Sequence, residues 1–337
     1  MNFQSFSDPQ IFNTLRDEWT PLLHRSSADG IFLTDEWQQT WWTAYHPGAL
    51  WIITCRTDDD ELIAIAPWFI EDHPTRGRVV RTVGCVEVTD YLDIIVARGY
   101  ESTFFPALAD YLAAHLHSYD VLDLCNIPAA SVTLACLPDQ LRACGFDVTV
   151  KLQEVCPVIE LPATWDDYLA RLDKKQRHEL RRKIRRAQGA PEGVAWYTVG
   201  PEHNLETELE RFLRLMASSA EEKAVFLRDP QNLTFFRTVA PVLMERGWLQ
   251  LNILTVGGNP AAAYLNFSYN NQVLVYNSGQ DGQYAHLSPG IVLLAYTIRH
   301  AIEHGQRVFD FLRGNENYKY QMGGRDTEVF MLIARHP

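Results

Sequence analysis

The sequence predicts a mixed α/β fold built from two similar lobes. The chain has 337 residues, which is long for one domain, so two domains are expected. Its hydrophobic fraction of 47% supplies enough apolar material for two cores. Each half also runs through helices, an antiparallel strand meander, a helix and further strands. We therefore expect an N-terminal lobe over 1–160 and a C-terminal lobe over 161–337, each with a mixed, mainly antiparallel sheet flanked by helices.

In the first half, helical spacing and period-2 alternation of apolar residues separate helices from strands. Asp35 is a candidate N-cap for the second helix. Alternation near 91–96 places Tyr91 and Asp93 on one strand face, where they either meet a substrate or cap a turn. The expected helices span 8–25, 35–45, 101–117 and 131–144. The expected strands span 50–56, 61–70, 78–83, 91–96, 120–125 and 147–153.

The second half repeats this order of elements, although no repeat is visible at the level of residue identity. The segments GGNP and YNN separate three strands of a predicted meander. The expected helices span 164–188, 204–220, 231–246 and 289–304. The expected strands span 193–199, 248–256, 260–269, 272–278, 307–312 and 327–334.

Cysteine spacing and hydropathy indicate an intracellular protein. None of the six cysteines forms C-x-x-C, and several lie in apolar, strand-like runs, so buried reduced thiols and a cytoplasmic location are expected. Zinc binding by Cys and His is not expected without paired spacing. No stretch approaches the ~18 apolar residues of a membrane helix. The N-terminus lacks the basic and apolar regions of a signal peptide, so export is not expected.

The charge distribution is uneven. The net charge of −12 argues against a general binder of nucleic acid or anionic membranes. Residues 171–186 nevertheless hold nine Lys/Arg against two acids, a local balance of +7. Lys174, Arg181 and Arg185 follow one line of the predicted helix, with Arg177 and Arg182 beside it. This face is either a solvated surface or an anion-facing ridge for a phosphate, a carboxylate-bearing substrate or RNA.

The segment LSPG predicts an anion site at a helix start. Ser288 is a candidate N-cap, Pro289 suits the first helical position, and Gly290 leaves the backbone open to a ligand. The unpaired N–H groups and the positive dipole end of such a helix favour a phosphate. His286, two residues before Ser288, lies in the preceding loop.

Titratable residues gather just downstream, at the end of a predicted strand. Asp310 lies between two phenylalanines, so its carboxylate is expected to be buried and to need partners. Pairing with Arg313 or a backbone amide and a catalytic role remain equal alternatives. Lys223 either reaches into the cleft or stays on the surface. His300 and His304 are four residues apart, yet with no third ligand in the sequence a metal site is not expected.

The sequence lacks the motifs of three common enzyme classes. Ser288 is not in a G-x-S-x-G elbow, so the sequence does not support a serine hydrolase of the α/β-hydrolase kind. The sequence also lacks the G-x-x-x-x-G-K-[ST] phosphate loop and the G-x-G-x-x-G dinucleotide motif.

Together these segments resemble the GNAT-superfamily acyltransferases of the BioF2-like/CelD-like type, which are related to the Fem peptidyltransferases. The resemblance covers nearly the full chain. In the first lobe it is carried by LIAIAPWF and DYLDIIV. In the second it is carried by KKQRHELRRKIRRA, by SSAEEKAVFLRD, and by AAAYLNF, VYNSGQDGQYAHLSPG and GQRVFDFLRGNENYKY.

The resemblance implies two GNAT-like lobes and acetyl-CoA, or another acyl-CoA, as co-substrate without a metal. A glycine-bearing loop before a helix grips the pyrophosphate in such enzymes, and the matching positions here are Leu287, Ser288, Pro289, Gly290 and Ile291. This loop has one glycine and departs from the common Q/R-x-x-G-x-G/A form. Tyr318 matches a tyrosine that protonates the departing thiolate, and Lys319 is similar to a lysine of the Fem-like transferases.

The expected chemistry is attack of an amine on a thioester, which needs a base, an oxyanion donor and an acid. Asp310 and Glu316 are alternatives for the base, and Lys319 and a strand amide near Asn277 are alternatives for the oxyanion donor. Tyr318 is the expected acid. The expected substrate-binding residues are Arg177, Arg181, Lys223, Asp281, Tyr284 and Arg313.

Three functions follow. The leading one is a cytoplasmic, acyl-CoA-dependent N-acyltransferase, with acetyl as the default group and a small amine or amino sugar as the acceptor. The second is a Fem-like transferase that uses charged tRNA, supported by residues 171–186 and opposed by the acidic total. The third is a non-catalytic binding protein with this fold, for which Tyr318→Phe and Lys319→Ala leave the biological activity intact.

Overall fold

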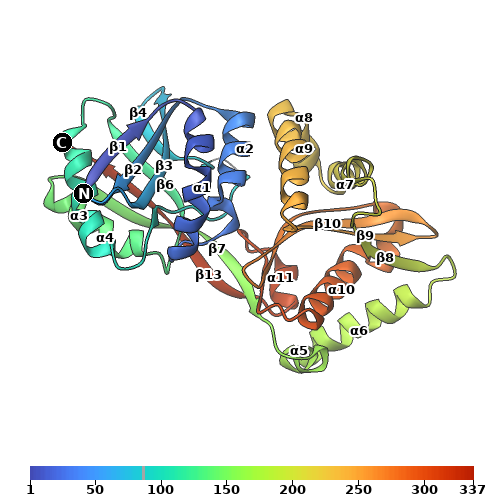
Figure 1. Cartoon of the computed structure of the whole chain (residues 1–337). Coiled ribbons are helices and arrows are strands. Elements are labelled where there is room, and N and C mark those ends of the chain that lie inside the picture. Colours follow the sequence, from blue (N-terminus) through green and yellow to red (C-terminus); the bar gives the residue numbers. More distant parts are fainter. Residues whose placement is uncertain (86–87) are drawn as a thin grey trace. The chain divides into compact units, whose positions relative to one another are not determined.

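The chain folds into two compact units, and the predicted mixed α/β class is confirmed (Figure 1). The structure is a computed structural model that describes residues 1–85 and 88–337. The first unit comprises Met1–Val155 and Thr327–Pro337, and the second comprises Cys156–Asp326. The last eleven residues were expected in the C-terminal lobe. They belong with the first unit because strand β13 pairs antiparallel with β6, from Val329–Pro128 to Arg335–Val121.

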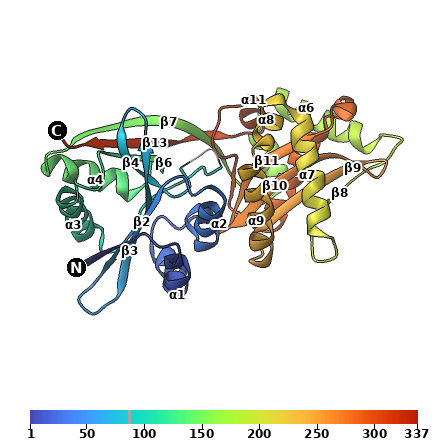
Figure 2. The ribbon, with the colours of Figure 1, turned by 90° about the horizontal axis from the view of Figure 1, so that it is seen from above.

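The sheet of the first unit has the strand order β1-β2-β3-β4-β6-β13-β7, and β5 pairs with β3. Within this unit β7 and β13 run beside each other (Figure 2). The helices are α1 (Gln10–Arg25), the 3₁₀ turn η1 (Ile31–Leu33), α2 (Asp35–Tyr45), α3 (Glu101–Ala114) and α4 (Val132–Ala143). The strands are β1 (Asn2–Phe6), β2 (Ala49–Arg56), β3 (Leu62–His73), β4 (Gly77–Thr82), β5 (Ile95–Val96), β6 (Val121–Pro128), β7 (Asp147–Glu160) and β13 (Arg325–Arg335).

Helices cover both faces of this sheet. On one face Ile53 of β2 shares a core with Phe105 of α3 and Leu137 of α4. On the other face the Trp41 ring of α2 lies 5.7 Å from the Phe69 ring of β3. Burial of such rings contributes much of the stability of a domain this size.

Some predicted local features of the first unit are corrected. Thr34, not Asp35, caps α2: its hydroxyl accepts a hydrogen bond from the Trp37 amide, and Asp35 is the first helical residue. The expected strand 91–96 shortens to β5. Strand β1 was not predicted, and it lies at the sheet edge with mostly exposed residues.

Asp93 has a structural role, because its carboxylate is buried and hydrogen-bonded within the first unit. Its Oδ1 accepts hydrogen bonds from the Thr133 hydroxyl (2.5 Å) and the Ile94 amide (2.8 Å). Burial raises the pKa of Asp93 to about 6, against the opposing hydrogen bonds of Ser131 and Thr133.

We therefore expect the free energy of unfolding to contain a term from Asp93 that is present at acidic pH and lost as pH rises through about 6. The folded-state pKa is raised, so the folded protein binds the proton more tightly. The term amounts to up to about 3 kcal/mol. Urea unfolding at pH 4 to 7 measures it: Asp93→Asn should flatten the curve, whereas Asp139→Asn on an exposed helix face should not. An unchanged slope for Asp93→Asn would contradict this assignment.

Two cysteines differ from the expected reduced state. Cys85 and Cys125 form a disulfide, whereas Cys55, Cys136, Cys144 and Cys156 are free. This pair was not predictable from local spacing, because the two residues are 40 apart and become neighbours only through the fold.

The sheet of the second unit has the order β12-β11-β10-β9-β8, and the last residues of β7 pair with β12. The helices are α5 (Trp165–Arg171), α6 (Lys174–Gln188), α7 (Leu205–Ser219), α8 (Glu221–Arg228), α9 (Pro230–Glu245), the 3₁₀ turn η2 (Gly282–Leu287), α10 (Pro289–Glu303) and α11 (Asn317–Gln321). The strands are β8 (Val194–Thr198), β9 (Leu249–Val256), β10 (Asn259–Tyr269), β11 (Gln272–Gln280) and β12 (Val308–Asp310).

The expected long helix 164–188 is two helices. Asp173 begins the second one: its carboxylate accepts a hydrogen bond from the Gln176 amide at 2.9 Å. Leu172 and Asp173 have extended backbones, which ends α5 and restarts the chain as α6. Helices α8 and α11 were not predicted, since both are short and lie in segments read as loops.

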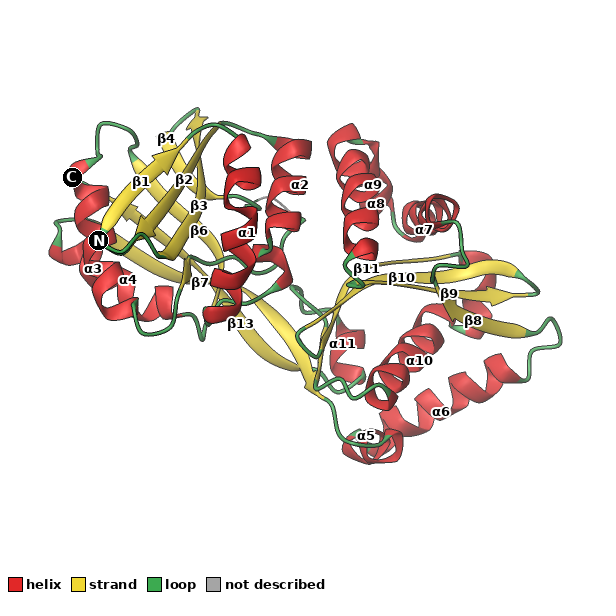
Figure 3. Ribbon diagram, in the orientation of Figure 1, coloured by secondary structure: helices red, strands yellow, loops and turns green. Residues whose placement is uncertain are grey.

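Helices α6 and α10 lie on one face of this sheet and α7 on the other (Figure 3). Helix α7 packs directly on β11 at Gly279, where a Cβ would lie 2.2 Å from the Met216 amide nitrogen. A side chain at this position would push the helix off the strand. Within the described ranges 1–85 and 88–337, no helix combines the length and hydropathy needed to cross a bilayer.

Candidate active site

The candidate site lies where strands β11 and β12 part. The two strands pair in parallel only from Gln272–Val308 to Leu274–Asp310. Strand β12 ends there, while β11 continues to Gln280. A register shift against β10 leaves Tyr276 as the extra residue of a bulge in β11. On the side that faces β12, the second half of β11 therefore has no strand partner among the described residues, and we call this place the opening.

Lys223 reaches into this opening from α8. Its ammonium donates to the Ser278 carbonyl at 2.5 Å and lies 3.4 Å from the Ser278 hydroxyl. Burial lowers the pKa of Lys223, and the negative charge of Glu316 opposes this shift. Lys223 is therefore not a freely solvated surface lysine, and Glu316 is close enough to act on its titration.

Lys319 is buried and holds the loop that follows β12. Its ammonium donates to the carbonyls of Leu312 (3.1 Å), Arg313 (2.7 Å) and Gly314 (3.0 Å). It also lies 2.9 Å from a carboxylate oxygen of Glu316. An ammonium has three hydrogens, and these contacts use them. This geometry favours a positioning role for Lys319 over the oxyanion-donor role suggested by the sequence.

Glu316 lies within electrostatic reach of Lys223, and Tyr318 follows it in α11. Glu316 is the residue before α11, and its side chain remains 57% exposed although it pairs with Lys319. Burial raises the pKa of Tyr318, with smaller contributions from Tyr264 and Glu316. The phenol is therefore protonated at neutral pH, as a proton donor must be.

The start of α10 is organised differently from the sequence prediction. Pro289 is its first residue, as predicted, but Ser288 has a left-handed backbone (φ 55°) and its side chain makes no cap. The Ser288 hydroxyl instead accepts a hydrogen bond from the Arg186 guanidinium of α6 at 3.2 Å. Among the described residues, the Gly290 and Ile291 amides have no protein acceptor, since the first capping bond runs from Val292 to Ser288.

These features fit a diphosphate. Two backbone N–H groups and one arginine converge at the start of a fifteen-residue helix. Gly290 leaves the backbone open there, and a Cβ at this position would displace the Gln280 side-chain oxygen, which would lie 2.7 Å away. Leu287, just before the turn, is buried and anchors it in the core.

Other predicted residues near β11 and β12 have local structural partners. Asp310 is buried, and its Oδ1 accepts a hydrogen bond from the Leu312 amide at 2.7 Å. Asn277 follows the bulge, and its side chain accepts a hydrogen bond from the Ser278 amide at 2.9 Å. Asp310 thus shapes the loop after β12, which leaves Glu316 as the more accessible carboxylate.

The remaining expected substrate contacts separate into two groups. Arg177 points back to α5, where its guanidinium lies 3.3 Å from the Leu169 carbonyl, and Asp281 caps η2 through the Gln283 amide. Tyr284 packs half-buried against the core. Arg181 is exposed on α6, and Arg313 contributes its carbonyl to Lys319. Arg177, Asp281 and Tyr284 therefore have structural contacts that account for their positions without a bound substrate.

Sequence reasoning missed Arg186 and Ser278. Arg186 belongs to the basic run 171–186, but helical spacing alone does not reveal which of its arginines lies near residue 288. Ser278 reaches the site because β11 continues past β12, a feature visible only in the pairing.

Residues 174–320 match the family model described as an acetyltransferase (GNAT) domain. Most of the second unit is therefore similar to a GNAT acetyltransferase domain. The matched segment contains α6, the start of α10 and every residue of the opening described above. No curated protein matches the sequence.

Solved structures share the fold across nearly the whole chain. FemX is similar with a TM-score of 0.66 at 12% identity, over 98% of this chain and 97% of its own. The C-terminal domain of a putative lysylphosphatidylglycerol synthetase from Agrobacterium fabrum has a TM-score of 0.56 at 10% identity, over 96% and 92%. L-PGS from Bacillus licheniformis has a TM-score of 0.54 at 12% identity, over 98% and 92%. At such identities the likeness concerns the fold alone.

Proposed function

We propose that this protein is an acyl-CoA-dependent N-acyltransferase of the BioF2-like/CelD-like type, with acetyl as the default group and a small amine or amino sugar as the acceptor. One observation carries the proposal: the uncapped start of α10, with Arg186 beside it, and the polar opening between β11 and β12 lie in the same matched GNAT domain. An acyl-CoA would bind its diphosphate at the former and reach the latter with its thioester.

In the proposed reaction the acceptor nitrogen attacks the thioester carbonyl, the C–N bond forms and the C–S bond breaks. Glu316 takes the proton of the amine, directly or through one water, because it is the exposed carboxylate of the opening. Tyr318 gives a proton to the departing thiolate. The amides of β11 near Asn277 and the Lys223 ammonium provide the positive field for the oxyanion.

Lys319 acts through the others in this scheme. By holding the carbonyls of residues 312–314 it fixes the loop that leads to Glu316 and Tyr318. Such positioning contributes to rate because small displacements of catalytic groups are costly.

Arg186→Ala is expected to weaken acetyl-CoA binding by about tenfold, the loss of one charge-assisted phosphate contact. Isothermal titration calorimetry with acetyl-CoA measures the dissociation constant. Arg182→Ala is the matched control, because Arg182 lies on the same helix and pairs with Glu179 at 2.7 Å. Equal affinity in both variants would remove Arg186 from the site, and absence of binding by the wild type at millimolar coenzyme would contradict the proposed function.

A second candidate is a transferase that uses aminoacyl-tRNA. It is supported by the exposed basic residues of α6, including Arg181, and by the fold shared with FemX. Salt-dependent RNA binding that is lost in Arg181→Gln/Arg185→Gln would support it. RNA binding that is equally strong in the double variant would remove that support.

A further inference from the structure

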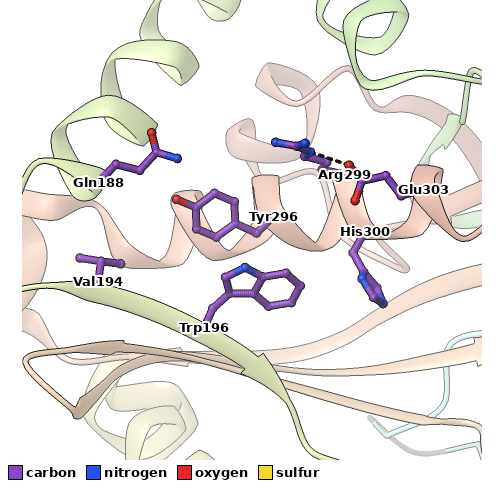
Figure 4. A pocket seen from close by; sticks show the side chains of 7 residues that line it. All are labelled: Gln188, Val194, Trp196, Tyr296, Arg299, His300 and Glu303. Carbon is purple, nitrogen blue, oxygen red and sulfur yellow. Dashed lines mark hydrogen bonds and ion pairs between the residues drawn. The ribbon is translucent and has the colours of Figure 1, made fainter.

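The second unit contains a cavity that the proposed reaction does not use. It has a volume of about 360 Å³, within the range of small-molecule pockets. The end of α6, strand β8 and the C-terminal half of α10 form its walls (Figure 4). Tyr296 lies eight residues beyond Ser288, about 12 Å along the helix, so the cavity is separate from the start of α10.

Three aromatic rings make up the floor of this cavity. The Trp196 and Tyr296 rings are stacked, with centroids 5.9 Å apart and an interplanar angle of 24°. The His300 ring meets Trp196 edge-on at 5.7 Å. All three side chains are partly exposed and line the cavity, and His304 covers one face of the His300 ring at a centroid distance of 3.8 Å. Ring faces of this kind bind other planar rings by stacking.

The polar groups of the cavity are uncharged or mutually neutralised. Arg299 and Glu303 form an ion pair at 2.7 Å on its rim. Burial, followed by the neighbouring His304, lowers the pKa of His300 against the charge of Glu303, so this ring is neutral at pH 7. The Gln188 amide faces the Tyr296 hydroxyl and hydrogen-bonds to it, and its remaining amide donor and acceptor capacity is left for a ligand (Figure 4).

We propose that this cavity binds an uncharged heteroaromatic ring, of the nucleobase class, which stacks beside Trp196 and Tyr296 and hydrogen-bonds at its edge to Gln188. Stacking needs the open ring faces, and the neutral rim disfavours ligands that carry a net charge. Among the described residues no protein group bonds the Trp196 indole N–H, which adds one donor for the ring edge. This site is independent of the acyl-CoA proposal.

The test is titration of the full-length protein with cytidine, followed by saturation-transfer difference NMR. Cytidine is neutral at pH 7.5 and is not part of coenzyme A, so its binding does not report on the α10 site. We expect saturable binding, weakened about tenfold or more in Trp196→Ala, as for loss of a stacked base. Trp196→Phe keeps a ring and should retain most of the affinity.

Tyr197→Ala is the matched control, because Tyr197 is the next residue of β8 and stacks on His203 on the opposite face of the strand. Its affinity for cytidine should equal that of the wild type, and thermal unfolding checks that each variant is folded. The proposal is overturned if cytidine does not saturate, if Trp196→Ala binds as the wild type does, or if methyl glucoside binds at the Trp196 site in preference to cytidine.

Discussion

Lys319→Met is expected to lower the free energy of unfolding by about 2 to 4 kcal/mol, because three carbonyls lose their charged donor in a buried place. Methionine is apolar and of similar length, so the decrease in the free energy of unfolding measures the lost hydrogen bonds and not the creation of a cavity. Urea unfolding monitored by circular dichroism measures the change.

Lys175→Met is the control for this substitution. Lys175 lies exposed on α6, and its replacement should change stability by less than about 0.5 kcal/mol. Activity is compared at a temperature where both variants are folded, and there Lys319→Met should still be slow because the loop carrying Glu316 has lost its anchor. Equal stability of the two variants would mean that the Lys319 ammonium does not hold this loop.

Glu316→Gln is expected to reduce the rate of acyl transfer by about 10² to 10⁴-fold, the usual contribution of a general base. Glutamine keeps the size of the side chain but cannot accept the proton. The substitution should leave acetyl-CoA affinity near that of the wild type, since the start of α10 is untouched. Steady-state kinetics with a panel of small amines, together with calorimetry, separates the two effects.

Glu222→Gln provides the comparison, because Glu222 is an exposed acid in the first turn of the neighbouring helix α8. It should leave the rate unchanged. If Glu316→Gln is as active as Glu222→Gln, another group takes the proton, and the buried Asp310 becomes the remaining acid at the end of β12.

Structural features that depend on residues close together in the chain could be predicted from the sequence. Pro289 begins α10, and the meander β9-β10-β11 lies close to its predicted bounds, since turn residues and alternation are local signals. The break between α5 and α6 was missed, although Asp173 is a good N-cap, because the apolar spacing continues across it.

Features that depend on tertiary contacts were not predictable. The return of β13 to the first unit depends on pairing with β6, some 200 residues earlier. A reactive role was expected for Lys319, because a sequence does not show which backbone carbonyls will surround a side chain in the fold. In the same way the contact of Lys223 with Ser278 joins residues 55 apart, and only the parting of β11 and β12 explains it.

A crystal structure of the protein with acetyl-CoA would show directly whether the start of α10 holds the coenzyme. We expect the diphosphate on the Gly290 and Ile291 amides beside Arg186, with the thioester in the opening near Lys223 and Glu316. Coenzyme bound elsewhere, or a start of α10 that stays closed to it at saturating concentration, would rule out this site.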